Sequence, residues 1–505
     1  MFQKVMSAGL WGIDGFLVSV EADVHDGLPG FAMTGNLSQE TKEAQERVRV
    51  AMKNGDFALP PKKITVNLSP ADVRKDGTAY DLAVAAAVLG ALGLLKTDGL
   101  EGAMLIGELG LDGRVKPVRG VLSLVFAARE GKLARCFLPK ENALEGSMVE
   151  DVEIIPVASL KELAAILRGD KGAGGPPLFS KGQERPYAVD FSELNGQPLL
   201  RRATEVAVAG RHNILYIGPA GAGKTMAAKR IPTIMPAMSW EESIQTSKIY
   251  SVCGLLPADT PMLTRRPFRS PHHTITATAL AGGGAVPKPG EISLASGGVL
   301  FLDELPEFSG KAIEILRQPL EDRTVTISRL HGSCIFPADT MVAAAMNPCP
   351  CGFYPDRTRC TCTGRQIERY IGKVSRPILD RIDITVEASP VPFEELRGQG
   401  DNESSAAIRE RVIRVQQLQK ERFTGTKLLF NSEMGTKEIG RYCRLNGPEE
   451  AYLEQVYKEK KLSVRGCNKI LKVARTIADL DGKEDIRKIH LYEAVGYRSL
   501  EEKYW

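Results

Sequence analysis

Ile214-Leu-Tyr-Ile-Gly218-Pro-Ala-Gly-Ala-Gly-Lys224-Thr225 is the stretch that decides the fold of the central part of this chain. An apolar run leads into a glycine-rich loop, and the helix-favouring residues 226–230 follow. This order of strand, loop and helix start is typical of a phosphate-binding loop, whose backbone N–H groups wrap a polyphosphate at a helix N-terminus. Lys224 is expected to reach the β- and γ-phosphates, and Thr225 to hold Mg²⁺. The predicted nucleotide-binding residues are Gly218, Pro219, Ala220, Gly221, Ala222, Gly223, Lys224 and Thr225.

A second motif, Gly297-Gly-Val-Leu-Phe-Leu-Asp303-Glu304, predicts that the nucleotide is hydrolysed. It reads as a buried strand that ends in two carboxylates. In nucleotide hydrolases with such a loop, a carboxylate at this place holds the Mg²⁺ shell, which is the role expected for Asp303. Glu304 is placed to polarise an attacking water as a general base. A solvated strand end is the alternative, and the phosphate-binding loop upstream in an α/β pattern favours hydrolysis.

Composition and charge indicate a globular protein with reduced thiols. The chain has 505 residues, of which 43% are hydrophobic and 25% charged, and its net charge of +4 is too small to prove a nucleic-acid partner. No apolar run reaches the roughly 18 residues of a membrane span, and the first residues do not resemble a signal peptide. Nine cysteines in so long a chain do not make a disulfide scaffold. We expect a cytoplasmic protein without a membrane partner.

Changes of pattern along the chain predict its domain boundaries. Residues 1–165 alternate short apolar strands with helical patterns. Gly and Pro are dense after residue 168, which predicts a linker over 166–189. Residues 190–392 are expected to form the nucleotide-binding core, with helices beside a mostly parallel sheet. Residues 393–505 are rich in helix-forming side chains and are expected to form a helical domain.

The motifs together resemble those of the AAA+ ATPases, in the magnesium-chelatase-like branch and specifically the ComM/YifB group. Beyond the two motifs above, the resemblance is carried by Arg266-Pro-Phe-Arg-Ser-Pro-His-His273, Gly290-Glu-Ile-Ser-Leu-Ala295 and Asn347-Pro-Cys-Pro-Cys-Gly352. It implies an α/β fold, with a P-loop AAA+ core and helical lid behind an α+β Lon-protease-like domain. It also implies an ATP- and Mg²⁺-dependent motor, a homo-hexameric branch-migration helicase that acts on single-stranded or branched DNA in recombination and natural transformation.

The same resemblance implies roles for single residues after the second motif. Asn347 follows an apolar strand and matches sensor 1, which orients the attacking water. Arg381 matches the arginine finger, whose guanidinium completes a neighbouring subunit's site, and Arg376 is the rival for that role. Arg465 matches sensor 2 on the helical lid. For any one arginine, an ordinary surface ion pair is the alternative.

A β-hairpin is predicted at 324–336, because two strand-like runs flank a turn that contains Gly332. In AAA+ relatives a hairpin here points into the central pore, which makes Arg329 and His331 candidates for DNA phosphate contacts. An ordinary solvated hairpin tip is the alternative. A further basic cluster could line the pore or the subunit interface, and the sequence does not separate these choices: Arg265, Arg266, Arg269, His272 and His273.

Two CxC pairs in a polar loop predict a metal site, formed by Cys349, Cys351, Cys360 and Cys362. Thiolates so close in sequence could hold one tetrahedral Zn²⁺, although CxxC is the usual spacing. Inert structural cysteines are the alternative, which fits a polar loop poorly because structural thiols are usually buried. We therefore predict a structural zinc ion that braces the loop carrying Asn347.

Residues 1–165 are similar to the Lon-type protease domain but lack its Ser-Lys dyad. The similarity is carried by 74–82, 107–118 and 138–142. The serine and lysine positions hold Ala79 and Leu122, so acyl transfer has neither nucleophile nor base. We expect this domain to serve assembly or nucleic-acid binding.

The alternative function is a chelatase-type or remodelling ATPase that acts on a protein partner. Magnesium-chelatase ATPase subunits lack a Lon-type front domain, and no porphyrin-binding feature can be read from this sequence. Salt-sensitive DNA binding would separate the two hypotheses, because phosphate contacts release counterions.

Overall fold

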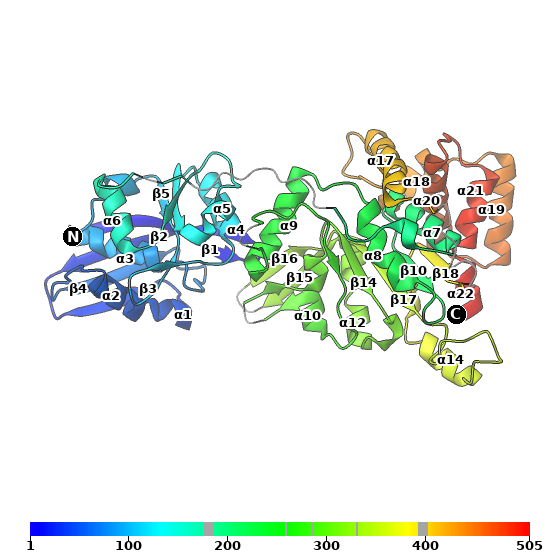
Figure 1. The fold of residues 1–505 in the computed structure, drawn as a ribbon, viewed down its shortest axis with the longest axis horizontal. Coiled ribbons are helices and arrows are strands. Elements are labelled where there is room, and N and C mark those ends of the chain that lie inside the picture. Colours follow the sequence, from blue (N-terminus) through cyan, green and yellow to red (C-terminus); the bar gives the residue numbers. More distant parts are fainter. Residues whose placement is uncertain (173, 176–185, 258–259, 285, 330–331, 392–401) are drawn as a thin grey trace.

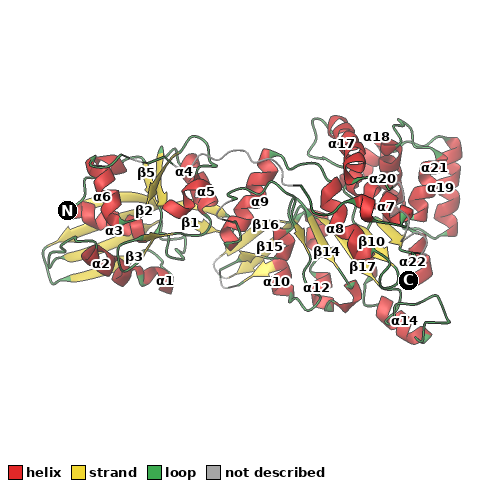
Figure 2. Ribbon diagram, viewed as in Figure 1, coloured by secondary structure: helices red, strands yellow, loops and turns green. Residues whose placement is uncertain are grey.

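The computed structural model describes residues 1–172, 174–175, 186–257, 260–284, 286–329, 332–391 and 402–505. The molecule is elongated, with an N-terminal sheet domain at one end, a parallel-sheet core in the middle and a group of helices at the other end (Figure 1). Strands occupy the first two regions and helices alone the last (Figure 2). Among the described residues, no helix has the length and apolar character that a membrane crossing requires.

The N-terminal domain is built on a seven-stranded mixed sheet in the order β3-β4-β2-β1-β5-β8-β9. Strand β2 is antiparallel to both β1 and β4, and the other neighbours are parallel. The strands are β1 Phe2–Trp11, β2 Asp14–His25, β3 Gly30–Thr34, β4 Lys63–Ser69, β5 Ala103–Leu105, β8 Arg135–Pro139 and β9 Glu153–Val157, with the small pair β6 Glu108–Leu109 and β7 Val115–Lys116.

Helices cover both faces of this sheet, because its strands carry apolar side chains on both sides. One buried cluster joins the sheet to α2 Ala44–Asn54, α3 Asp81–Ala91 and α6 Leu160–Arg168. A second cluster joins the opposite face to α4 Val121–Glu130 and α5 Ala143–Gly146. Helix α3 is buried around nearly its whole circumference, which explains why its sequence is apolar throughout. The short α1 is Gln39–Lys42.

The core is a five-stranded, all-parallel sheet in the order β11-β14-β17-β10-β18. Alternate residues of the three central strands, β14, β17 and β10, enter two different clusters, so both faces are buried and these strands read as continuous apolar runs. One face packs on α7 and α8, and the other on α12, α14 and α15. Their bounds are β10 Ile214–Ile217, β11 Phe268–Arg269, β14 Val299–Leu302, β17 Met341–Met346, β18 Ile384–Glu387, α7 Pro198–Gly210, α8 Lys224–Ile234, α12 Gly310–Glu314, α14 Gly364–Ile371 and α15 Arg376–Leu379.

Several shorter elements project from this sheet. Two of them are the hairpins β12–β13 and β15–β16, and β15 and β16 lie on the side that faces the N-terminal domain (Figure 1). Their strands and the remaining helices are α9 Trp240–Cys253, α10 Ala277–Ala281, β12 Gly282–Gly283, β13 Lys288–Pro289, α11 Glu291–Leu294, α13 Arg317–Asp322, β15 Thr324–Arg329 and β16 Gly332–Pro337. The predicted hairpin therefore forms as expected, and its register pairs Ser328 with Ser333.

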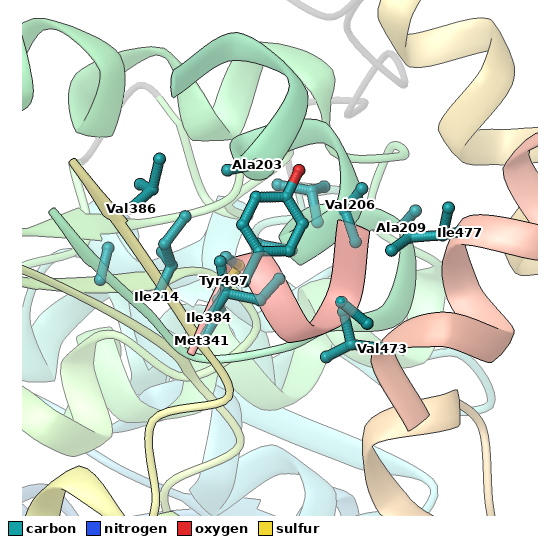
Figure 3. Packing of buried hydrophobic residues seen from close by; sticks show 14 of the residues in the cluster. Ala203, Val206, Ala209, Ile214, Met341, Ile384, Val386, Val473, Ile477 and Tyr497 are labelled. Carbon is teal, nitrogen blue, oxygen red and sulfur yellow. The ribbon is translucent and has the colours of Figure 1, made fainter. Parts of the chain in front are cut away.

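The C-terminal helices share one apolar core with α7 and the parallel sheet. Val473, Ile477 and Tyr497 meet Ala203, Val206, Ile214 and Ile384 in this core (Figure 3). A buried polar bridge crosses the same boundary, where His212 contacts Asp383 at 3.3 Å and Thr476 at 2.9 Å. The helices are α17 Ser405–Arg422, α18 Thr436–Tyr442, α19 Gly447–Glu459, α20 Val464–Leu480, α21 Lys488–Gly496 and α22 Ser499–Tyr504. The α/β fold class expected from the sequence is confirmed.

The N-terminal domain docks on the core through α4 and α9. Trp240 and Ile244 of α9 pack against the apolar cluster that contains Leu122. The carboxylate of Glu145 accepts hydrogen bonds from the Leu122 N–H, at 2.8 Å, and from the Ser251 hydroxyl. Burial raises the pKa of Glu145. Position 122, where the resemblance to Lon-type proteases predicts a lysine, is therefore a buried part of an internal interface.

Candidate nucleotide-binding site

The glycine-rich loop lies between β10 and α8, at the carboxyl edge of the parallel sheet. Such edges are where ligands bind in parallel α/β folds. The loop needs Gly218 at its start, because a Cβ there would lie 2.3 Å from the Ala388 carbonyl oxygen beyond β18. The loop opens on a cavity of about 430 Å³, which falls within the usual range for ligand pockets. The lining includes residues 220–226 with Asp303, Glu304, Met346 and Asn347.

Lys224 is held at the floor of this cavity by oxygen atoms of the loop. Its ammonium group donates to the carbonyls of Gly218 at 2.6 Å and Pro219 at 2.8 Å, and to Oδ1 of Asn347 at 3.1 Å. Burial lowers the pKa of Lys224 to about 8, and the nearby charges of Asp303 and Glu304 oppose that shift. A bound polyphosphate would stabilise the charged form of Lys224, since it adds negative charge next to the ammonium group.

Two oxygen ligands for a divalent cation already lie together. The Thr225 hydroxyl donates to Oδ2 of Asp303 at 2.8 Å, because β14 and the start of α8 meet at the same sheet edge. A hydroxyl and a carboxylate are hard ligands of the kind Mg²⁺ takes beside phosphate oxygens. The two residues predicted to hold Mg²⁺ are therefore adjacent, and the donor set fits that ion.

Glu304 occupies a constrained position at the mouth of the cavity. Its backbone is left-handed with φ of 53°, and its N–H donates to Oδ1 of Asp303 at 3.0 Å. The Glu304 carboxylate lies 3.2 Å from Nδ1 of His273. The ring of His273 packs against that of His272 in a tilted arrangement, with centroids 4.1 Å apart. The general-base candidate therefore has an imidazole partner that sequence analysis did not assign to the site.

The basic cluster before α10 is largely used in internal ion pairs. Arg266 is buried and pairs with Glu242 at 3.1 Å. Arg269 forms a bidentate pair with Glu291, with both contacts at 2.6 Å. These two arginines, one just before β11 and one in it, therefore stabilise the core of their own chain.

The two arginines expected to act in catalysis lie together at the opposite, amino edge of the sheet. Arg381 contacts Glu321 at 2.6 Å, and Arg465 contacts the same carboxylate oxygen at 3.1 Å. They line a second cavity of about 690 Å³, whose wall also includes Asn213 and Thr340, the residues just before β10 and β17. The P-loop and Asn347 follow the other ends of those strands. One chain therefore does not bring Arg381 or Arg465 to its own nucleotide cavity.

The rival finger residue and the DNA-contact candidates lie apart from both cavities. Arg376 is exposed at the start of α15. Arg329 is exposed near the tip of hairpin β15–β16, and its guanidinium donates to the Gly284 carbonyl at 3.2 Å. Arg329 therefore joins the ends of the two hairpins. His331 lies outside the described residues.

The cysteine loop folds back on itself directly behind the P-loop. The sulfur atoms of Cys349, Cys351, Cys360 and Cys362 all lie within 4.8 Å of one another. Cys349 and Cys360 are buried, in contrast to the exposed appearance of the loop in the sequence. The predicted ligands are thus brought together.

Family models match most of the chain. The model described as magnesium chelatase, subunit ChlI, matches residues 190–396. Subunit ChlI of Mg-chelatase matches residues 20–142, and the C-terminal model of the same subunit matches residues 402–498.

Whole-length similarity extends to proteins of several bacteria. Competence protein ComM of Haemophilus influenzae is 40% identical over 503 residues, which cover 98% of this chain and 97% of the relative. Protein YifB of Salmonella typhimurium is 39% identical over 495 residues, with 97% and 96% coverage. Lon protease of Azorhizobium caulinodans is 28% identical over 170 residues, which cover 31% of this chain and 20% of that protein.

Proposed function

The chain belongs to the ComM/YifB family of magnesium-chelatase-like AAA+ ATPases, and from this premise we propose that it is a ring motor that hydrolyses ATP to move on DNA. The finer activity we propose is branch migration of recombination intermediates during natural transformation. The name of the Haemophilus influenzae relative, competence protein ComM, supports this setting. The membership confirms the resemblance that the motifs indicated.

The proposed hydrolysis assigns a separate task to each group of the nucleotide cavity. Lys224 moves its hydrogen bonds from the loop carbonyls to the β- and γ-phosphates. Thr225 and Asp303 would hold Mg²⁺, which would supply positive charge beside the phosphates. The Glu304 carboxylate takes a proton from the attacking water, and the Asn347 amide orients that water. Asn347 already lies 3.1 Å from the lysine that reaches the phosphates, which supports this assignment.

The position of Arg381 and Arg465 is the observation that supports a ring. Both side chains lie at the amino edge of the sheet, while the nucleotide cavity lies at the carboxyl edge of the same sheet. A head-to-tail contact would place the amino edge of one subunit against the nucleotide of the next, which is a heterologous interface that closes into a ring. We propose a homo-hexamer in which these arginines act in trans on the γ-phosphate.

Hairpins β12–β13 and β15–β16 are the proposed DNA-contacting elements. Arg329 is exposed at their junction, where it can pair with a backbone phosphate without losing a buried partner. The same proposal places the protein in the cytoplasm, where ATP and recombination intermediates are found.

The ATPase rate of the purified protein, with and without four-way-junction or forked DNA, tests this function. We expect DNA to stimulate turnover at low salt and less so at moderate salt, because phosphate contacts release counterions. Glu304→Gln should abolish the stimulated rate and keep ATP binding. If DNA neither binds nor stimulates at low salt, the motor hypothesis is wrong and a protein client is favoured instead.

A further inference from the structure

We propose that the cysteine loop holds one structural Zn²⁺ ion, and that this ion fixes the wall behind the P-loop so that metal occupancy controls nucleotide binding. The ligands are Cys349, Cys351, Cys360 and Cys362. The coupling to the nucleotide rests on the proposed ATPase function, whereas the metal site itself does not.

The distances between sulfur atoms match a mononuclear tetrahedral site. Cys349 lies 3.3 Å from Cys351 and 3.8 Å from Cys360, and the distance from Cys351 to Cys360 is 3.6 Å. A tetrahedron with zinc–sulfur bonds of about 2.3 Å has an edge of about 3.8 Å. A disulfide would need a separation of about 2.0 Å. In an iron–sulfur cluster the cysteine thiolates bind separate iron atoms, so their sulfur atoms would lie farther apart than the sulfur atoms do here.

The surroundings of the loop suit a thiolate site that carries excess negative charge. Four thiolates around Zn²⁺ leave a net charge of −2, and the loop itself supplies two arginines. Arg357 donates to the Cys362 carbonyl at 3.2 Å, and Arg359 covers the Phe353 ring at 4.1 Å. The Tyr354 N–H points to the Cys349 sulfur at 3.4 Å, as an outer-shell donor to a metal ligand does. Soft sulfur ligands in tetrahedral array select zinc over harder divalent ions.

The loop connects the metal directly to the nucleotide cavity. Cys349 follows Asn347 by two residues, so the ion anchors the chain that carries the sensor amide. Gly352 has a left-handed φ of 84°, and a Cβ built there would lie 3.8 Å from the Ala220 nitrogen of the P-loop. Phe353 and Tyr354 line a separate cavity of about 360 Å³ together with the first P-loop residues. Without the metal, the cysteine loop would no longer be held in place beside Asn347 and Ala220.

Metal analysis of the full-length protein, purified under reducing conditions without chelators, tests the site. We expect roughly one zinc per chain in the wild type, and a loss of about tenfold in Cys351→Ser and Cys362→Ser. Cys253→Ser and Cys467→Ser remove isolated thiols and serve as matched controls that keep the zinc. Lys224→Ala should also keep it, which separates the metal site from ATPase function. Less than about a tenth of a zinc per wild-type chain, or iron in its place, would overturn the proposal.

A second measurement applies even if the serine variants do not fold. A mercurial titration of the wild type should release zinc to a metallochromic indicator as the thiols are consumed. The dissociation rate of a fluorescent ADP analogue, recorded in parallel, should rise as zinc leaves. An unchanged dissociation rate after full release would overturn the coupling to the nucleotide cavity, while the zinc content would still decide the site.

Discussion

The proposal that Arg381 serves the nucleotide site of a neighbouring subunit predicts that replacement of Arg381 by alanine removes ATP hydrolysis and leaves nucleotide binding intact. The Asn213 side chain, just before β10, donates to the Arg381 carbonyl at 3.1 Å. The P-loop begins after β10 ends at Ile217. At about 3.3 Å per residue, strand β10 puts roughly 16 Å between Asn213 and the start of the P-loop. Removal of an arginine finger costs about a thousandfold or more in turnover, equivalent to roughly 4 kcal/mol.

Mixing of two inactive variants measures whether Arg381 acts in trans. Arg381→Ala subunits retain the P-loop lysine, and Lys224→Ala subunits retain the arginine. In an equal random mixture, about one interface in four joins an intact lysine to an intact arginine, so roughly a quarter of wild-type phosphate release should return. No recovery, in a sample where exchange of labelled subunits is demonstrated, would refute the reasoning. Arg376→Ala is the matched control, and the same pattern with that variant would transfer the role to Arg376.

The other predictions concern protonation, the Glu304 contact and DNA. The pKa of Lys224 is lowered to about 8, so above that pH the nucleotide-free protein must take up a proton to bind ATP. The affinity for ATP should therefore fall as the pH rises above about 8. Calorimetry in buffers of different ionisation enthalpy measures this proton uptake. The free energy of unfolding should rise over the same window, because the unfolded lysine keeps its proton to a pH of about 10.5; urea titrations at several pH values check it. His273→Ala should raise DNA-independent ATP turnover by up to about fivefold if its 3.2 Å contact restrains the Glu304 carboxylate, since one such contact is worth about 1 kcal/mol; an unchanged basal rate would contradict that restraining role. Arg329→Ala should lower the slope of DNA affinity against salt by about one unit, whereas Arg114→Ala, in the turn between β6 and β7 of the N-terminal domain, should leave that slope unchanged.

The residues of the nucleotide cavity could be predicted from local motifs. The positions of Arg465 and His273 could not, because they depend on packing between segments that are distant in the sequence. The P-loop, Asp303 and Asn347 each follow a buried strand, so their meeting at one edge follows from parallel strand order. The location of Arg465 depends on the face of the core against which the helices pack, and no local pattern reports that. His273 reaches Glu304 because β11 and β14 are neighbours, although 30 residues separate Arg269 from Val299 in the chain.

Helix α9 covers a part of the N-terminal domain that the resemblance to Lon-type proteases would assign to catalysis. The side chains of Trp240 and Ile244 occupy the surface beside Leu122, and Ala79 packs on the same apolar cluster. A lysine placed at position 122 would therefore lie beside a surface that α9 already occupies. Because α4 and α9 are in contact, this interface attaches the N-terminal domain to the parallel-sheet core, and a displacement of α9 would alter the position of both.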